Sequence, residues 1–284
     1  MKLIAYVLLP LAIALHCQKG KVDSGSLKRA EELNTEGKLL FSRHQLEGAF
    51  SKFKSAAFFD PYNAEYPNNM GMCQMELGAP DQAITSFEKA IALKPELPLY
   101  HMNLGMAYEK LSMPEKATEA FQAAVDRDPG FQDGWLRLGM INLAGGKAAQ
   151  AQEAWDKGSA AKPDAEYEST VGAYLVEKGN AASGKNRFLK AIQINPEFSQ
   201  AHFNLGVVYQ RNGDLKEAAK EYEKTTALEP RNFLAYYNLG VVQTRLEQKD
   251  KAQVSLKKFL ELLPPGYPTQ KYDAEQRLRD LNSR

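Results

Sequence analysis

The sequence predicts an all-α solenoid of seven helix-turn-helix repeats, followed by a single C-terminal capping helix. Two residue ladders support this prediction. Glycine recurs at Gly37, Gly71, Gly105, Gly139, Gly172, Gly206 and Gly240, and proline recurs at Pro61, Pro95, Pro129, Pro163, Pro196, Pro230 and Pro264. Both ladders advance by 34, 34, 34, 33, 34 and 34 residues. Because two residue types share one spacing and one deletion, the chain is built from internal repeats.

Between the ladders, apolar residues follow the period of a helix. In the sixth repeat, residues 201–212 place His202, Leu205 and Tyr209 on one stripe. Gly213 is predicted to end this helix as a left-handed cap. A second helix is predicted over residues 215–228, and Pro230 stops it because proline cannot continue a helix. The same plan gives repeats at 30–63, 64–97, 98–131, 132–164, 165–198, 199–232 and 233–266.

The two ends of the predicted array differ. At the C-terminal end (267–284), residues 269–281 form a helical pattern without a partner helix, and Ala274, Leu278 and Leu281 make its apolar stripe. A capping helix is expected there, because the last repeat would otherwise expose its core. No such cap is predicted before the first repeat.

The junction between repeats four and five departs from the pattern. Gly158 and Gly184 fall inside predicted helices, and the one-residue deletion lies between them. A glycine inside a helix costs on the order of 1 kcal/mol relative to alanine. The junction, over residues 155–190, is therefore predicted to be the softest part of the array.

Residues 1–16 have the composition of an export signal. The apolar run 3–15 is too short to cross a bilayer as a helix, which takes about 20 residues. Cys17 follows at once, and the arrangement resembles a bacterial lipoprotein signal with a lipidated cysteine and a polar tether over 17–29. That family prefers a small residue where this chain has His16. Ordinary signal cleavage after Ala14 is the alternative.

The two interpretations of the N-terminus imply different locations. Lipidation at Cys17 implies an exported protein that is anchored by lipid to a membrane of the bacterial cell envelope. Ordinary cleavage implies a periplasmic or secreted protein.

Charge and cysteine content narrow the function classes. The 284 residues include 36 basic and 35 acidic side chains, for a net charge of +1. Such a chain has no overall attraction to nucleic acid. Cys73 is the only other cysteine, so no internal disulfide is expected if Cys17 is acylated or removed.

The repeat itself resembles the tetratricopeptide repeat (TPR). Counted from the first residue of each repeat, the TPR pattern has small residues at positions 8, 20 and 27, an aromatic residue at 24 and proline at 32. The third repeat supplies Gly105, Ala117, Phe121, Ala124 and Pro129 at these positions. The resemblance covers residues 30–266. It implies a right-handed superhelix in which the first helix of each pair lines a concave wall, with ligand contacts at positions 2, 5, 6, 9, 12 and 13.

Those positions define a candidate peptide-binding groove. Position 6 holds asparagine in four repeats, which resembles an asparagine row that binds extended peptide, although the family consensus has asparagine there without a ligand too. Positions 5 and 9 add apolar side chains, among them methionines 34 residues apart, and methionine-rich surfaces adapt to varied partners. The candidate groove residues are Asn69, Met72, Met102, Asn103, Met106, Leu136, Met140, Phe203, Asn204, Val207, Tyr237, Asn238 and Val241.

No catalytic, cofactor or metal site is expected. Residues 179–186 approach the phosphate-loop pattern but lack its final Ser or Thr, and they fall at a repeat turn. His101 and His202 both occupy packing position 4, without metal-ligand spacing. The residue set with which some TPR proteins clamp a C-terminal carboxylate is also absent.

The resemblance thus implies a membrane-anchored, non-enzymatic scaffold that binds a protein or peptide segment in its groove and serves envelope assembly. Three alternatives stay open. The protein could be a self-associating structural protein or the non-catalytic partner of an enzyme complex, or its groove could take a lipid or other small apolar ligand.

Overall fold

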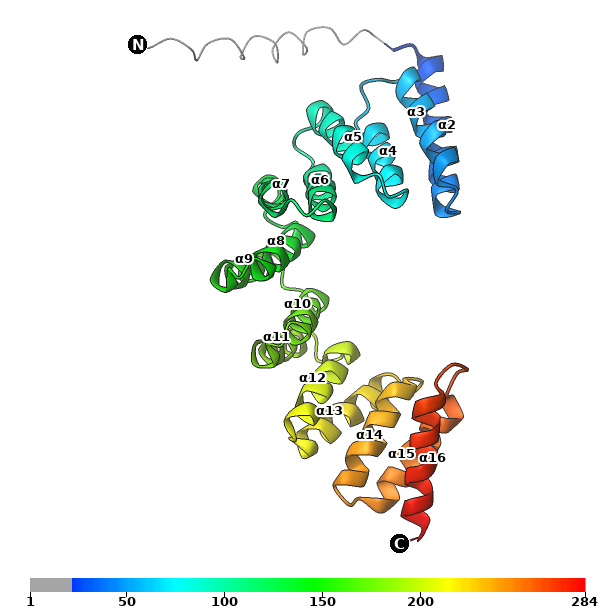
Figure 1. Cartoon of the computed structure of the whole chain (residues 1–284), viewed down its shortest axis with the longest axis vertical. Helices are drawn as coiled ribbons and strands as arrows, with labels where there is room; N and C mark the ends of the chain where they lie inside the picture. The colour runs from blue at the N-terminus through cyan, green and yellow to red at the C-terminus, as the bar shows by residue number, and fades with distance from the viewer. Residues whose placement is uncertain (1–21, 284) are drawn as a thin grey trace, which may run out of the picture. The chain divides into compact units, whose positions relative to one another are not determined.

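The computed structural model describes residues 22–283, and all regular structure in that range is helical (Figure 1). Seven consecutive helix pairs precede one unpaired helix, which confirms the predicted all-α repeat architecture. The pairs are α2 (Ser24–Ser42) with α3 (Leu46–Phe59), α4 (Glu65–Glu76) with α5 (Pro80–Leu93), α6 (Pro98–Lys110) with α7 (Pro114–Arg127), α8 (Gln132–Ala144) with α9 (Ala148–Ala161), α10 (Ala165–Glu177) with α11 (Ala181–Ile194), α12 (Ser199–Asn212) with α13 (Leu215–Leu228), and α14 (Phe233–Arg245) with α15 (Lys249–Leu262). The unpaired helix is α16 (Pro268–Ser283).

The described chain divides into two compact units. The N-terminal unit ends at Ala154 and the C-terminal unit begins at Trp155, so the division falls within α9. The first three helix pairs therefore lie entirely in the N-terminal unit, and the last three pairs and α16 lie entirely in the C-terminal unit.

One residue of the turn inside each helix pair adopts a left-handed conformation. Four repeats place glycine there, at Gly78, Gly146, Gly179 and Gly213, with φ between 74° and 87°. The predicted cap at Gly213 is confirmed, with φ 87° and ψ 3°. The other three repeats hold His44, Ser112 and Glu247 in the same conformation, at φ 59°, 56° and 59°. The turn thus requires this geometry in every repeat, even where the sequence supplies no glycine.

Ladder glycines leave room for the large side chain at position 24 of the same helix pair. A Cβ atom added to Gly105 would lie 2.5 Å from the ring of Phe121, and one added to Gly206 would lie 2.7 Å from the ring of Tyr222. The ring of Tyr222 also reaches the next repeat, since it packs with Leu239 in one core cluster. Glycine at position 8 therefore lets the position-24 ring fill the space between neighbouring pairs.

The first helix begins earlier than the sequence predicts. The polar tether is expected to run to residue 29, but α2 already starts at Ser24. The Asp23 side chain caps it by accepting a hydrogen bond from the Ser26 backbone N–H at 2.9 Å. This local N-cap lengthens the first helix into the polar segment.

The predicted capping helix is present as α16. Its Ala274 and Leu281 are buried in a cluster with Leu256 and Phe259 of α15. The Tyr237 hydroxyl of α14 donates a hydrogen bond to Asp273 at 2.9 Å. Helix α16 therefore covers the apolar face that the last repeat would otherwise expose.

Gly184 stands at position 20 of its repeat, where the repeat pattern calls for a small residue, and it lies at a close contact between the two helices of the pair. A Cβ atom at this position would lie 2.5 Å from Val176 Cγ2 and 2.8 Å from the Gly172 carbonyl oxygen. Helices α10 and α11 therefore approach each other too closely for any side chain at this point. The intrinsic cost of this glycine is offset by close helix packing.

Candidate peptide-binding groove

The first helices of the first three pairs, α2, α4 and α6, line an open hollow of about 420 Å³ together with Phe53 of α3. Its walls are mostly apolar, and Lys38 is the one charged residue among them. The lining residues are Lys38, Phe41, Phe53, Asn68, Asn69, Met72, Leu99, Met102, Asn103 and Met106. Five of the thirteen predicted groove residues thus meet in one place: Asn69, Met72, Met102, Asn103 and Met106.

A second hollow of about 630 Å³ adjoins the first and extends it toward α8. The two hollows share Met72, Asn103 and Met106. The second is more polar at its rim, where Glu76, Glu109, Lys110 and Arg137 join Met75, Gly78 and Phe87. Together they make one groove across the inner face of the N-terminal unit, which we call the methionine groove.

The methionines of this groove are half-buried. Met72, Met102 and Met106 are neither sealed in the core nor fully exposed, and the neighbouring Leu99 is 44% exposed. The aromatic core side chain Phe87 beneath them is fully buried. An unbranched thioether side chain in such a position can change rotamer to fit a partner.

The groove asparagines bond to each other across repeat boundaries. Asn103 Nδ2 donates to Asn68 Oδ1 of the preceding repeat at 2.7 Å, and Asn69 Nδ2 donates to Asn34 Oδ1 of the repeat before that at 3.2 Å. Asn68 Nδ2 links the two bonds by donating to Asn69 Oδ1 at 3.4 Å. Asn103 is only 5% exposed. In this unit the asparagines therefore tie α2, α4 and α6 together, and they form the floor of the groove.

The asparagine chain ends at an ion pair. Asn34 Nδ2 donates to Glu65 Oε1 at 3.3 Å, and Lys38 Nζ lies 2.5 Å from the same oxygen. Partial burial of Glu65 disfavours its charged form, but the hydrogen bonds from Lys38 and Asn34 outweigh this, so the pKa of Glu65 lies below its ordinary value. Asn34 and Asn68 are not among the predicted site residues. Both stand at position 5, one residue before the asparagine row, and that adjacency is the signal that could have found them.

The remaining predicted groove residues line neither hollow. Leu136 and Met140 are half-buried on α8. In the C-terminal unit, Phe203 packs on Tyr222 with ring centroids 5.9 Å apart, and Val207 packs against the same core cluster. Asn204, Tyr237, Asn238 and Val241 are half-buried; Asn204 accepts a hydrogen bond from Gln200 on its own helix, and Tyr237 bonds to Asp273 of α16.

A metal ion and a reactive cysteine are two features that support catalysis in many enzymes. No group of three or more His, Cys, Asp or Glu side chains between residues 22 and 283 could hold a metal ion. Cys73 is a free, buried thiol, and burial raises its pKa to about 11, so it stays protonated and unreactive at neutral pH. Cys17, the predicted lipidation site, lies outside the described residues.

Four family models match the chain. One, described as "TPR repeat", matches residues 74–112 and 211–246, and three described as "Tetratricopeptide repeat" match residues 102–166, 188–220 and 234–264. Together these matches cover more than half of the sequence. The chain belongs to the tetratricopeptide-repeat family. TPR domains are protein-interaction modules, and this one fits that class.

No curated protein matches the sequence. Solved structures share the fold at low identity. The C-terminal part of a TPR repeat-containing protein from Cytophaga hutchinsonii is 18% identical, with 86% of this chain and 98% of that chain covered and a TM-score of 0.61. Yeast Tom70 is 16% identical, with 96% and 57% covered and a TM-score of 0.60. A tetratricopeptide repeat protein from Parabacteroides merdae is 18% identical, with 90% and 100% covered and a TM-score of 0.52.

Proposed function

We propose that this TPR protein binds a partner protein by holding the apolar face of a helical segment in the methionine groove. The observation that carries the proposal is the continuity of the two hollows through Met72 and Met106. Their volumes, about 420 and 630 Å³, lie in the range of roughly 300–1,000 Å³ that is typical of ligand pockets. Exposed apolar surface of this kind marks interaction sites.

The hydrogen-bond pattern favours a helical over an extended segment. An extended peptide brings unpaired backbone N–H and C=O groups and needs polar partners in the groove. Here the Asn69 and Asn103 amides already bond to Asn34 and Asn68. A helix satisfies its own backbone and presents only side chains, which suits a methionine-lined wall. The sequence-based expectation of an asparagine row reading an extended peptide is therefore replaced by this proposal for the N-terminal unit.

A designed probe tests both parts of the proposal. The probe is a fluorescein-labelled, 18-residue amphipathic peptide of Leu, Ala, Lys and Glu, and its matched control is the same peptide with proline at position 9. We expect the intact helix to bind with measurable anisotropy change and the proline peptide to bind at least tenfold more weakly. Equal binding of both peptides would retain the groove and remove the helical requirement.

A variant shows whether the probe occupies the groove. Met106→Glu places a charge between the two hollows and is expected to weaken probe binding at least tenfold, since burying an unpaired charge is costly. Val254→Glu, on an exposed side chain of α15, is the control and should bind as the wild type does. Light scattering should show a monomer, whereas a dimer disrupted by Met106→Glu would show that a second copy fills the groove.

We further propose that the protein is exported and held at a bacterial envelope membrane through lipid on Cys17, where the groove serves envelope assembly. The support is sequence alone: the apolar run 3–15 directly followed by cysteine. Between residues 22 and 283, no helix is long and apolar enough to cross a bilayer. Mass spectrometry of the N-terminal peptide from native membranes tests the anchor. A diacylglyceryl adduct on Cys17 is expected, and an unmodified N-terminus beginning after Ala14 would indicate ordinary cleavage.

A further inference from the structure

Neighbouring repeats share a recurrent side-chain bond. In repeats three, four and six, the residue at position 4 donates a ring N–H to the carbonyl oxygen of the proline that ends the preceding repeat. His101 reaches Pro95 O at 2.9 Å, Trp135 reaches Pro129 O at 2.8 Å, and His202 reaches Pro196 O at 3.0 Å. At each of these junctions, the loop between the helix pairs has four residues: 94–97, 128–131 and 195–198.

The junction between repeats four and five cannot make this bond. Its loop, 162–164, has only three residues, which locates the one-residue deletion. Position 4 of repeat five is Glu168, whose carboxylate has no N–H to donate to Pro163. Glu168 is nevertheless completely buried.

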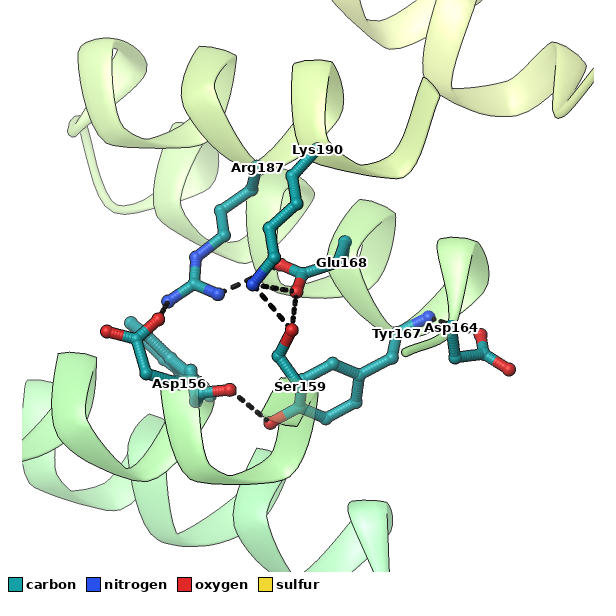
Figure 2. A network of polar contacts seen from close by, with 8 residues as sticks. Asp156, Ser159, Asp164, Tyr167, Glu168, Arg187 and Lys190 are labelled. Atoms are coloured by element: carbon teal, nitrogen blue, oxygen red, sulfur yellow. Dashed lines mark hydrogen bonds and ion pairs between the residues drawn. The ribbon is translucent and has the colours of Figure 1, made fainter. Parts of the chain in front are cut away.

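An ion cluster surrounds Glu168 (Figure 2). Arg187 Nη1 lies 2.9 Å from Glu168 Oε2, and Lys190 Nζ lies 2.8 Å from Oε1. Both cations come from α11, and Figure 2 shows them reaching toward the carboxylate of α10. The Glu168 carboxylate is thereby paired with two positive charges despite its burial.

The C-terminal half of α9 completes the cluster. The Ser159 hydroxyl donates to Glu168 Oε1, and Asp156 Oδ1 lies 2.8 Å from Arg187 Nη2. The Tyr167 hydroxyl donates to the Trp155 carbonyl oxygen at 3.3 Å. All of these groups belong to the C-terminal unit. The ion cluster (Asp156, Ser159, Glu168, Arg187 and Lys190) therefore links repeat four to both helices of repeat five.

The next repeat has the acidic residue and its partner exchanged between the same two positions. In repeat six, position 4 is His202 and position 23 is Glu221, with the His202 Nδ1 and Glu221 Oε2 atoms 2.6 Å apart. In repeat five, position 4 carries the acid and position 23 the base, Arg187. His202 can bond to Glu221 and to the preceding proline at once, whereas Glu168 can only accept bonds and must turn to donors from α9 and α11.

We propose that the ion cluster is an ionic latch that replaces the proline-carbonyl bond at the shortened junction and fixes the register of α9 on α10 and α11. Buried ion pairs contribute little net stability compared with apolar packing, but removal of one partner leaves an uncompensated charge. The latch thus makes this junction dependent on the charge of Glu168. The groups in contact with the carboxylate are Ser159 from α9 and Arg187 and Lys190 from α11. Asp156 of α9 is the acidic group beside them, paired with Arg187.

Hydrogen exchange measured by mass spectrometry on the full chain tests the latch. Glu168→Gln removes the charge with little change of shape, and Glu166→Gln, on an exposed residue of the same helix, is the matched control. We expect amide exchange over residues 155–190 to rise at least tenfold in Glu168→Gln and to stay at the wild-type rate in Glu166→Gln. Unchanged exchange in Glu168→Gln, or a rise spread evenly over residues 199–283 as well, would overturn the proposal.

A second variant, which transfers features of the repeat-six junction to this one, tests the proposal if Glu168→Gln fails to fold. The variant Glu168→His/Arg187→Glu, with one alanine inserted between Pro163 and Asp164, gives the junction the loop length, the proline-to-position-4 separation and the residue pair of repeat six. It should fold and restore wild-type protection over residues 155–190. The same substitutions without the insertion should not restore it, because the shorter loop keeps the proline carbonyl out of reach. Equal protection with and without the insertion would contradict the link between loop length and latch.

Discussion

Asn103 of α6 donates a hydrogen bond to Asn68 of α4 over 2.7 Å, across the boundary between two repeats. The bond repeats one step earlier between Asn69 and Asn34. These asparagine side chains would suit peptide recognition, but here they bond to each other and connect neighbouring repeats. The side chains of the groove that remain for the proposed partner are mainly the methionines.

The Asn103–Asn68 bond makes a stability prediction. Asn103→Ala leaves the Asn68 carbonyl oxygen without its donor at a buried site, and we expect a loss of about 1–3 kcal/mol in the free energy of unfolding. Asn204→Ala is the matched control, since Asn204 holds the same repeat position but bonds to Gln200 on its own helix. Its loss should stay near about 0.5 kcal/mol. Urea unfolding measures both, and equal losses would show that the inter-repeat bond contributes nothing.

The left-handed turn residues predict a stabilising substitution. Ser112 is exposed and has φ 56°, a conformation that costs a side-chain-bearing residue about 1–2 kcal/mol. Ser112→Gly should raise the free energy of unfolding by about 0.5–1 kcal/mol. The gain is smaller than the strain relieved, because glycine also increases the conformational entropy of the unfolded chain. Urea unfolding of the variant beside the wild type measures the change.

The reverse substitution provides the control. Gly146 has φ 75°, and a Cβ atom added to it would meet no other atom within 4 Å, so Gly146→Ser adds backbone strain without a clash. It should lower stability by a similar amount. Shifts of the same sign in both variants would exclude backbone conformation as the cause.

His101 predicts a pH dependence. Burial lowers the pKa of His101 below its ordinary value of 6.5, the nearby Arg127 acts in the same direction, and the bond to Pro95 opposes them only in part. The folded state therefore binds fewer protons than the unfolded state. Stability is fully present above pH 6.5 and falls as the pH drops through that value toward the lower folded-state pKa.

Two measurements check the His101 prediction. Nuclear magnetic resonance should place the imidazole titration below pH 6.5, and His101→Phe should lose less stability than the wild type between about pH 7.5 and about pH 5.5. The Pro95 carbonyl keeps a donor in that variant, since Arg127 Nε bonds to it at 2.6 Å. An imidazole that titrates at or above its ordinary value would contradict the assignment.

Hydrogen exchange over residues 155–190 also tests whether the junction between repeats four and five is the least protected part of the array. The sequence predicts weak protection there from Gly158 and Gly184. The close contact at Gly184 and the ion cluster at Glu168 instead predict ordinary protection at neutral pH. Burial raises the pKa of Glu168, but its hydrogen bonds from Lys190, Ser159 and Arg187 outweigh burial and lower the pKa overall. The stabilisation is therefore present above the unfolded-state pKa and is lost as the pH falls through the folded value.

The repeat plan could be predicted from the sequence because the ladder glycines and prolines each have one structural role that fixes the residue type. Gly105 faces Phe121 and the prolines end helices, so spacing alone located the pairs. The groove was predictable in part, since Met72, Met102 and Met106 fall on the inner helices by repeat position. Whether an asparagine faces a ligand or another asparagine depends on the neighbouring position 5, where Asn34 and Asn68 stand. The ion cluster around Glu168 could not be predicted for the same reason: the three side chains that donate to Glu168 come from two other helices.

The most direct test of the groove is a capture experiment on native membranes. Photo-crosslinking with the wild type should give specific partners that are lost with Met72→Glu/Met106→Glu, while circular dichroism shows the variant still folded. Val254→Glu should retain them. Partners that persist unchanged in the folded groove variant would show that binding uses another surface, and would contradict the methionine groove as the site.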